Sequence, residues 1–148
     1  MEWAALISWV LTAGGGFVLL SMWLRRGGMR QQQNGGSRIR PPLILSHFLL
    51  AATGLVIWII YLVADKDALA WIAFVILAVV AVLGWTMFAI WARRRQARTH
   101  AIGETAAAGT AAVPAEQHFP VPIVALHGVL AVTTVVLVLL AALEVGTS

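Results

Sequence analysis

Four long apolar runs divide the chain, and short polar stretches separate them. The runs cover residues 3–24, 42–63, 69–92 and 121–143, and none of them carries an acidic, lysine or arginine side chain. A helix needs about 20 consecutive apolar residues to cross the hydrocarbon core of a bilayer. The pattern therefore predicts an all-α integral membrane protein in which residues 1–148 form a single domain, a bundle of four transmembrane helices.

The polar connectors predict how these helices are arranged. Residues 64–68 form a tight turn, which makes the second and third helices antiparallel neighbours. Nine of the ten lysines and arginines lie in the two longer connectors, 25–41 and 93–120. The positive-inside rule puts both connectors in the cytoplasm, and both chain termini outside the cytoplasmic membrane. Trp23 and Trp91 fall near the inner boundary, where aromatic belts form.

Composition supports a membrane protein and excludes several functions. Hydrophobic residues make up 61% of the chain, charged residues 11%, and the mean hydropathy is +0.90. The absence of cysteine excludes disulfides and thiolate-held iron–sulfur clusters. No phosphate-binding loop, dinucleotide fingerprint or HExxH motif is present. The net charge of +4 reflects membrane topology, so no nucleic-acid partner is expected. Rich usage of Ala, Val, Gly and Arg suggests a bacterial source.

One motif, Pro-x4-His-x2-Leu-Ala-x-Thr, occurs at residues 42–53 and again, 80 residues later, at 122–133. The first and third runs also match, with Gly16 and Gly84 at equivalent positions 68 residues apart. The two offsets differ by about the length of an Ala/Gly-rich tract in the second connector, which reads as a flexible linker. This pattern predicts a duplicated helix hairpin with a pseudo-two-fold axis along the membrane normal. The alternative is four unrelated hydrophobic helices.

The duplication makes His47 and His127 equivalent residues that lie at the same depth in the membrane. Each follows its helix-starting proline by five residues, which is roughly 7.5 Å along a helix. Two imidazoles that face each other across an axis can provide both axial ligands of a haem b iron. Ala51 and Ala131 lie on the histidine face at i+4, and their small side chains leave room for a porphyrin edge.

Other residues at this level fit the same interpretation. Gly16 and Gly84 lie on the remaining two helices, where a flat macrocycle can press against them. Arg25 and Arg93 lie at the same end of the bundle, where they can pair with haem propionates or with an anionic lipid headgroup. Tight helix packing also accounts for the glycines, and positive-inside topology also accounts for the arginines.

The histidines have alternative roles. An ionisable residue inside a span is a functional candidate, but a neutral histidine at this depth can also form a structural hydrogen bond between helices, or contact a quinone or lipid. A zinc site would lack two of its ligands. Thr53 and Thr133, six residues beyond the histidines, are expected to bond to the backbone of their own helices.

Four helices with paired histidines near one face resemble the small b-type cytochromes of bacterial membranes, the cytochrome b561-like and dehydrogenase membrane-anchor group. The resemblance rests on the architecture and on His47 and His127. Such proteins commonly carry more histidines, often for two haems, whereas this chain has one pair. The resemblance implies one-electron transfer with a quinone or a partner dehydrogenase. The alternative function is a non-catalytic four-helix subunit that assembles with or stabilises a larger membrane complex, as a partner subunit or a homo-oligomer.

Overall fold

A computed structural model describes residues 1–33, 39–102 and 114–145, including their side chains except at 32, 33, 98–102 and 145. Four of its helices are long and apolar enough to cross a membrane, as predicted. In chain order the elements are α1 (Glu2–Arg25), α2 (Gly28–Gln33), α3 (Pro41–Ala64), α4 (Asp67–Ile102), the 3₁₀ helix η1 (Ala115–His118) and α5 (Val121–Val145).

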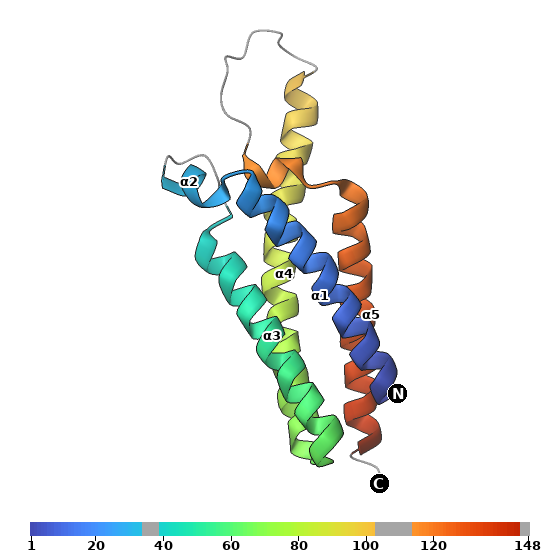
Figure 1. The fold of residues 1–148 in the computed structure, drawn as a ribbon. Helices are drawn as coiled ribbons and strands as arrows, with labels where there is room; N and C mark the ends of the chain where they lie inside the picture. The colour runs from blue at the N-terminus through green and yellow to red at the C-terminus, as the bar shows by residue number, and fades with distance from the viewer. Residues whose placement is uncertain (34–38, 103–113, 146–148) are drawn as a thin grey trace.

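The four long helices form a bundle in which each contacts two others (Figure 1). The closest pairs are α3 with α4 and α1 with α5, whereas α1 lies diagonally from α4 and α3 diagonally from α5. Figure 1 shows the N-terminus and the α3–α4 turn at one end, called the terminal end below, and α2 and η1 at the opposite, connector end. The four-helix bundle and the antiparallel α3–α4 pair are thus confirmed.

Local sequence explains where the helices begin and end. Pro41 occupies the first turn of α3, where a missing N–H costs no intrahelical hydrogen bond. Asp65 ends α3 in the left-handed conformation, at φ 49°, which aspartate tolerates better than most residues. Gly27, at φ 74°, turns the chain from α1 into α2.

Both connectors contain helical structure that the apolar pattern does not predict. The first includes α2, and the second includes η1. Helix α4 runs to Ile102, ten residues beyond the predicted end of the third span. Arginine, glutamine and alanine dominate this extension, and all three are good helix formers, so the helix continues after the apolar run stops. The Ala/Gly-rich tract at 103–113 lies outside the described residues.

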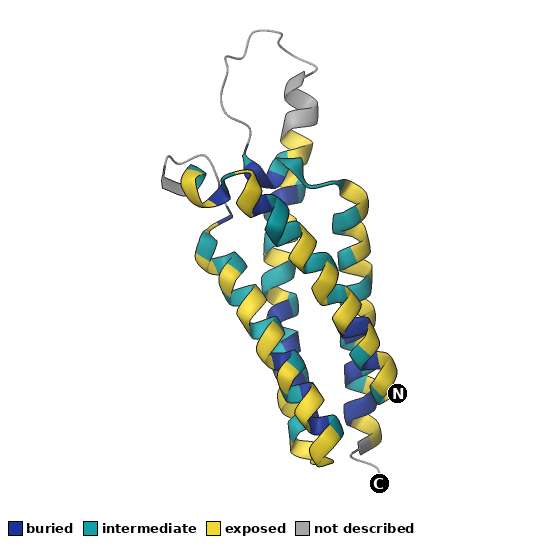
Figure 2. Cartoon of the chain, viewed as in Figure 1, coloured by how far each residue is buried: buried dark blue, intermediate teal, exposed yellow. Residues whose placement is uncertain are grey.

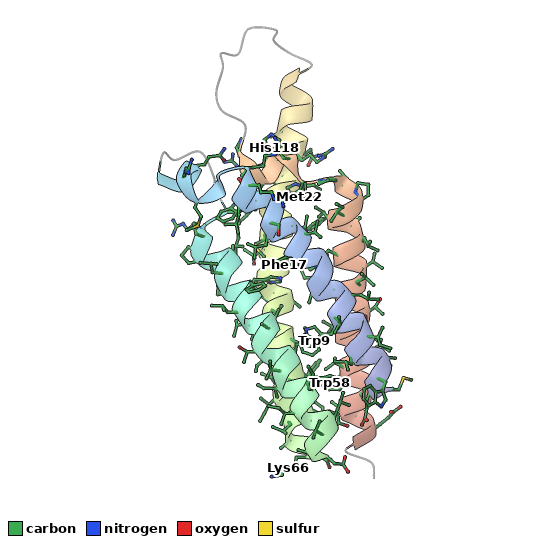
Figure 3. The ribbon with its side chains drawn as sticks, in the orientation of Figure 1. Trp9, Phe17, Met22, Trp58, Lys66 and His118 are labelled. Atoms are coloured by element: carbon green, nitrogen blue, oxygen red, sulfur yellow. The ribbon has the colours of Figure 1, made fainter. Side chains whose placement is uncertain are left out.

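Buried side chains gather in two places (Figure 2). One is the terminal half of the bundle. The other is a cap at the connector end, which comprises the last turns of α1, the middle of α4, and all of α2 and η1. The terminal core contains an aromatic cluster. The ring centroids of Trp9 and Trp58 lie 6.4 Å apart (Figure 3), and those of Trp58 and Tyr61 lie 4.9 Å apart. The Tyr61 hydroxyl donates a hydrogen bond to the Glu2 carboxylate. This cluster ties α3 to the start of α1.

Candidate functional site

His47 and His127 lie close together in the interior of the bundle, between the four long helices. They come from α3 and α5, which lie diagonally and have no direct backbone contact. Their ring centroids are nevertheless only 6.4 Å apart, with an angle of 65° between the ring planes. Since the backbones are distant, both side chains point inward, and the two residues singled out by the repeated motif form one pair.

Each histidine is oriented by a hydrogen bond to the backbone of a neighbouring helix. The Nδ1 atom of His47 lies 3.1 Å from the carbonyl oxygen of Val80, and that of His127 lies 3.0 Å from the carbonyl oxygen of Thr12. A carbonyl oxygen only accepts, so both Nδ1 atoms carry a proton and donate it. In a neutral imidazole this arrangement leaves the lone pair on Nε2, the nitrogen able to bind a metal.

Glycines make room for both rings. A Cβ atom on Gly16 would lie 3.1 Å from Cε1 of His127, and a Cβ atom on Gly84 would lie 3.2 Å from Cε1 of His47. These separations are tighter than ordinary van der Waals contact, so a larger residue at either position would displace the imidazole. The glycines predicted to approach a cofactor therefore lie directly against the histidines.

The histidine contacts repeat with the offsets found in the sequence. Gly84 follows Gly16 by 68 residues, and the acceptor Val80 follows the acceptor Thr12 by the same number. Each histidine packs on a helix of the other copy, because His47 contacts α4 and His127 contacts α1. Both halves of the chain are thus required to build the pair.

Fully buried side chains are absent from the described residues at the histidine level. No described residue is buried in the corresponding stretch of any long helix, 10–22 of α1, 41–53 of α3, 81–90 of α4 and 121–133 of α5. His47, His127, Ala51 and Ala131 are all only half-buried.

One side of the site carries hydroxyl groups that sequence analysis missed. The Thr134 hydroxyl lies 2.8 Å from that of Ser8 and 3.0 Å from that of Thr12, whose backbone carbonyl accepts the hydrogen bond from His127. Under the repeat offsets the corresponding residues are apolar. Those counterparts are Ile76 for Ser8, Val80 for Thr12 and Gly54 for Thr134. The two histidines therefore share their immediate contacts but have different surroundings.

The remaining predicted residues lie further away. Arg25 and Arg93 are exposed near the connector end, nine residues beyond Gly16 and Gly84, or roughly 13 Å along each helix. Thr133 donates to the carbonyl of Val129 on its own helix, which confirms that part of the prediction.

Within the part of the chain that the structure describes, no group of three or more His, Cys, Asp or Glu residues could hold a metal ion. No protein-family model, curated protein or solved structure matches the chain.

Proposed function

We propose that this protein is a membrane redox subunit that binds one haem b between His47 and His127 and exchanges electrons with a quinone or a partner dehydrogenase. One observation carries the proposal. Both histidines donate their Nδ1 proton to a backbone carbonyl, so each neutral imidazole keeps a lone pair on Nε2 that can bind iron. The two ring centroids are only 6.4 Å apart. A hydrogen bond from the other ring nitrogen is the usual way proteins fix a metal-binding histidine.

The separation of the rings is compatible with a shared metal. A metal–imidazole bond is about 2 Å long, so rings this close would both be able to reach one iron atom. The centroids of His47 and His127 lie 6.4 Å apart. An angle of 65° between the rings is compatible, because each imidazole can rotate about its metal–nitrogen bond.

The surroundings support a flat, partly anionic ligand. Gly16 and Gly84 keep two helices free of side chains beside the rings, and the half-buried Ala51 and Ala131 offer small side chains on the other two. Haem supplies one-electron chemistry, and the protein contributes the axial ligands and the apolar surroundings that set its potential. The arginines at the connector end are suited to pair with propionates.

We place the protein in a bacterial cytoplasmic membrane, with the connector end inside and both termini outside. Seven described arginines lie at the connector end and one described lysine at the terminal end, which favours this orientation by the positive-inside rule. The histidines would then lie nearer the cytoplasmic face, where a peripheral dehydrogenase could dock.

A visible spectrum of the purified protein tests this proposal. Protein expressed with haem supplied should show a Soret band, which His47→Ala and His127→Ala should abolish or shift. His100→Ala, which changes a histidine outside the pair, serves as the control. Absence of the band in the wild type, or an unchanged band in both single variants, would refute haem ligation by this pair.

A ligand exchange separates ligation from simple structural damage. His127→Met should retain haem but raise its reduction potential, because a thioether in place of an imidazole favours ferrous iron. A variant that merely disturbed the fold would lose haem without this change in potential. An unaltered potential in a haem-loaded His127→Met protein would exclude His127 as a ligand.

The histidine hydrogen bonds also favour a second candidate, the non-catalytic subunit. The hydrogen bond of His47 links α3 to α4, and that of His127 links α5 to α1. Each histidine can therefore serve only to stabilise the packing of its own helix pair. This function predicts a colourless protein that co-purifies with a larger complex in mild detergent. Both histidine variants would then lower stability without any spectral effect.

A further inference from the structure

Unpartnered polar atoms are concentrated in the cap at the connector end, which comprises the last turns of α1, the middle of α4, and all of α2 and η1. Among the described residues, five buried side-chain nitrogen atoms have no hydrogen-bond partner. Four of them belong to the cap: Trp23 Nε1, Trp91 Nε1, Gln117 Nε2 and His118 Nδ1. Buried polar atoms are nearly always hydrogen-bonded in folded proteins, so this concentration needs an explanation.

Two of these atoms belong to η1, and the other two belong to helices that pack against η1. Helix η1, which carries Gln117 and His118, packs against α1, α2 and α4 (Figures 1 and 3). The backbone N–H of Ala115 donates a 2.7 Å hydrogen bond to the Gln31 side chain and so ties η1 to α2. The indole of Trp23 lies directly against Gly28 at the start of α2, where any side chain would overlap it.

The two tryptophans are buried and equivalent in the repeat. Trp23 is 1% exposed and Trp91 is 6% exposed, so neither faces the lipid as a member of an aromatic belt would. They are 68 residues apart, the offset that relates Gly16 to Gly84. Each lies seven residues beyond its glycine, or roughly 10 Å along the helix towards the connector end.

The chemistry of these atoms selects an acceptor. An indole N–H and an amide NH₂ only donate, and His118 Nδ1 donates in one of its tautomers. Three obligate donors are best satisfied by a group with several lone pairs, and a charged acceptor makes the stronger bonds. Seven described arginines lie at this end, namely Arg25, Arg26, Arg30, Arg40, Arg93, Arg94 and Arg95, against one buried acid, Glu116. The balance of charge favours an anion.

We propose that the cap binds an anionic oxygen group, a phosphate or a carboxylate, through the indole N–H groups of Trp23 and Trp91 with Gln117 and His118 as further donors. The phosphate of an anionic lipid headgroup is one source. The propionate of a haem is the other, and only that source rests on the proposed function. The cap therefore adds a binding site for an anion beyond the histidine pair.

Substitution of tryptophan by phenylalanine tests the site, since it removes the N–H and keeps an aromatic ring. Trp23→Phe/Trp91→Phe is compared with Trp58→Phe, which removes the third unpartnered indole N–H among the described residues, in the terminal half. Native mass spectrometry measures retention of phosphatidylglycerol against phosphatidylcholine with the same acyl chains. For a phosphate ligand we expect the double variant to lose at least about tenfold in phosphatidylglycerol affinity, and Trp58→Phe to stay within about twofold of the wild type.

The carboxylate source is tested with haem and its dimethyl ester, in which both propionates are neutral. The wild type and Trp58→Phe should prefer haem to the ester, and the double variant should lose that preference. Either result supports the site and identifies the ligand. If the wild type binds haem, the proposal is refuted when the double variant matches Trp58→Phe in both the lipid and the haem measurement. If the wild type binds no haem, a match in the lipid measurement alone refutes it. Failure of haem binding itself is read separately, from the Soret band.

Discussion

The substitution Thr134→Val tests whether the buried hydroxyl cluster holds α5 against α1. Valine has nearly the shape of threonine, so the change removes the hydroxyl and leaves the packing volume almost unchanged. In the wild type, the Thr134 hydroxyl contacts the Ser8 hydroxyl at 2.8 Å and the Thr12 hydroxyl at 3.0 Å, and it donates to the carbonyl of Leu130 on its own helix. Thr134 is 1% exposed, so water does not replace these partners.

The expected loss follows from the two contacts between helices. Hydrogen bonds between side chains of membrane helices contribute about 0.6 kcal/mol on average and about 1.7 kcal/mol at most. The Thr12 hydroxyl also donates to the backbone carbonyl of Ser8, so its single proton serves two acceptors and its contact with Thr134 is the weaker one. The two contacts with α1 together therefore contribute about 0.6–1 kcal/mol. Ser8 also loses a partner while it remains buried, which adds to the cost. We expect Thr134→Val to lower the free energy of unfolding by about 1–2 kcal/mol.

Reversible unfolding in mixed detergent micelles, followed by circular dichroism, measures this loss. Thr133→Val is a matched control, because Thr133 is an exposed neighbour of the same type whose hydroxyl bonds only to its own helix, at Val129. Its expected effect is below about 0.5 kcal/mol. In a double-mutant cycle, Ser8→Ala and Thr134→Val should be coupled by at least about 0.5 kcal/mol. Equal stability of the two threonine variants, or strict additivity in the cycle, would show that the cluster does not stabilise the α1–α5 pair.

Two further substitutions test the terminal half of the bundle. Tyr61→Phe removes the hydrogen bond to Glu2 and should lower the free energy of unfolding by about 1–2 kcal/mol in the same assay. Glu2→Gln keeps an acceptor oxygen and should lower it by less. A larger loss for Glu2→Gln than for Tyr61→Phe would contradict this assignment. Gly54→Ala places a Cβ atom 3.0 Å from Cζ2 of Trp9 and should cost about 1–2 kcal/mol by overpacking. Gly128→Ala, with no atom within 4 Å of the new Cβ, should be neutral or slightly stabilising, and an equal loss in both glycine variants would exclude overpacking as the cause.

The apolar pattern was sufficient to predict the four helices, because span length follows directly from bilayer thickness. The repeated motif was sufficient to select His47 and His127, because equal spacing from a helix-starting proline gives equal depth. The faces of the helices were harder to predict. A membrane helix is apolar on all sides, so its sequence does not show which residues face inward. Ser8 and Thr134 therefore gave no signal before the structure placed their hydroxyls together.

The connector end was predicted least well, for a related reason. Polar, glycine-containing segments are typical of flexible linkers, yet here short helices form where buried tryptophans provide an apolar surface. Trp23 and Trp91 occur at a predicted membrane boundary, and position alone does not distinguish a lipid-facing tryptophan from one covered by a connector. A tertiary contact decides this, and for Trp23 the signal was the adjacent Gly28, whose missing side chain admits the indole.

Differences between the two halves help to locate the function. In the terminal half the repeats have diverged in size, since Trp9 of α1 packs on Gly54 of α3 while the equivalent positions hold Leu77 and Thr134. The first repeat pairs a large residue, Trp9, with a small one, Gly54, whereas the second has two residues of medium size, so the summed side-chain volume is nearly the same in both. Packing alone therefore tolerates divergence between the repeats. At the histidine level the same repeats keep the histidine, the glycine beside it and the carbonyl that accepts its proton. A purely structural contact had the same freedom to diverge, so the retained symmetry favours a ligand that requires two equivalent imidazoles.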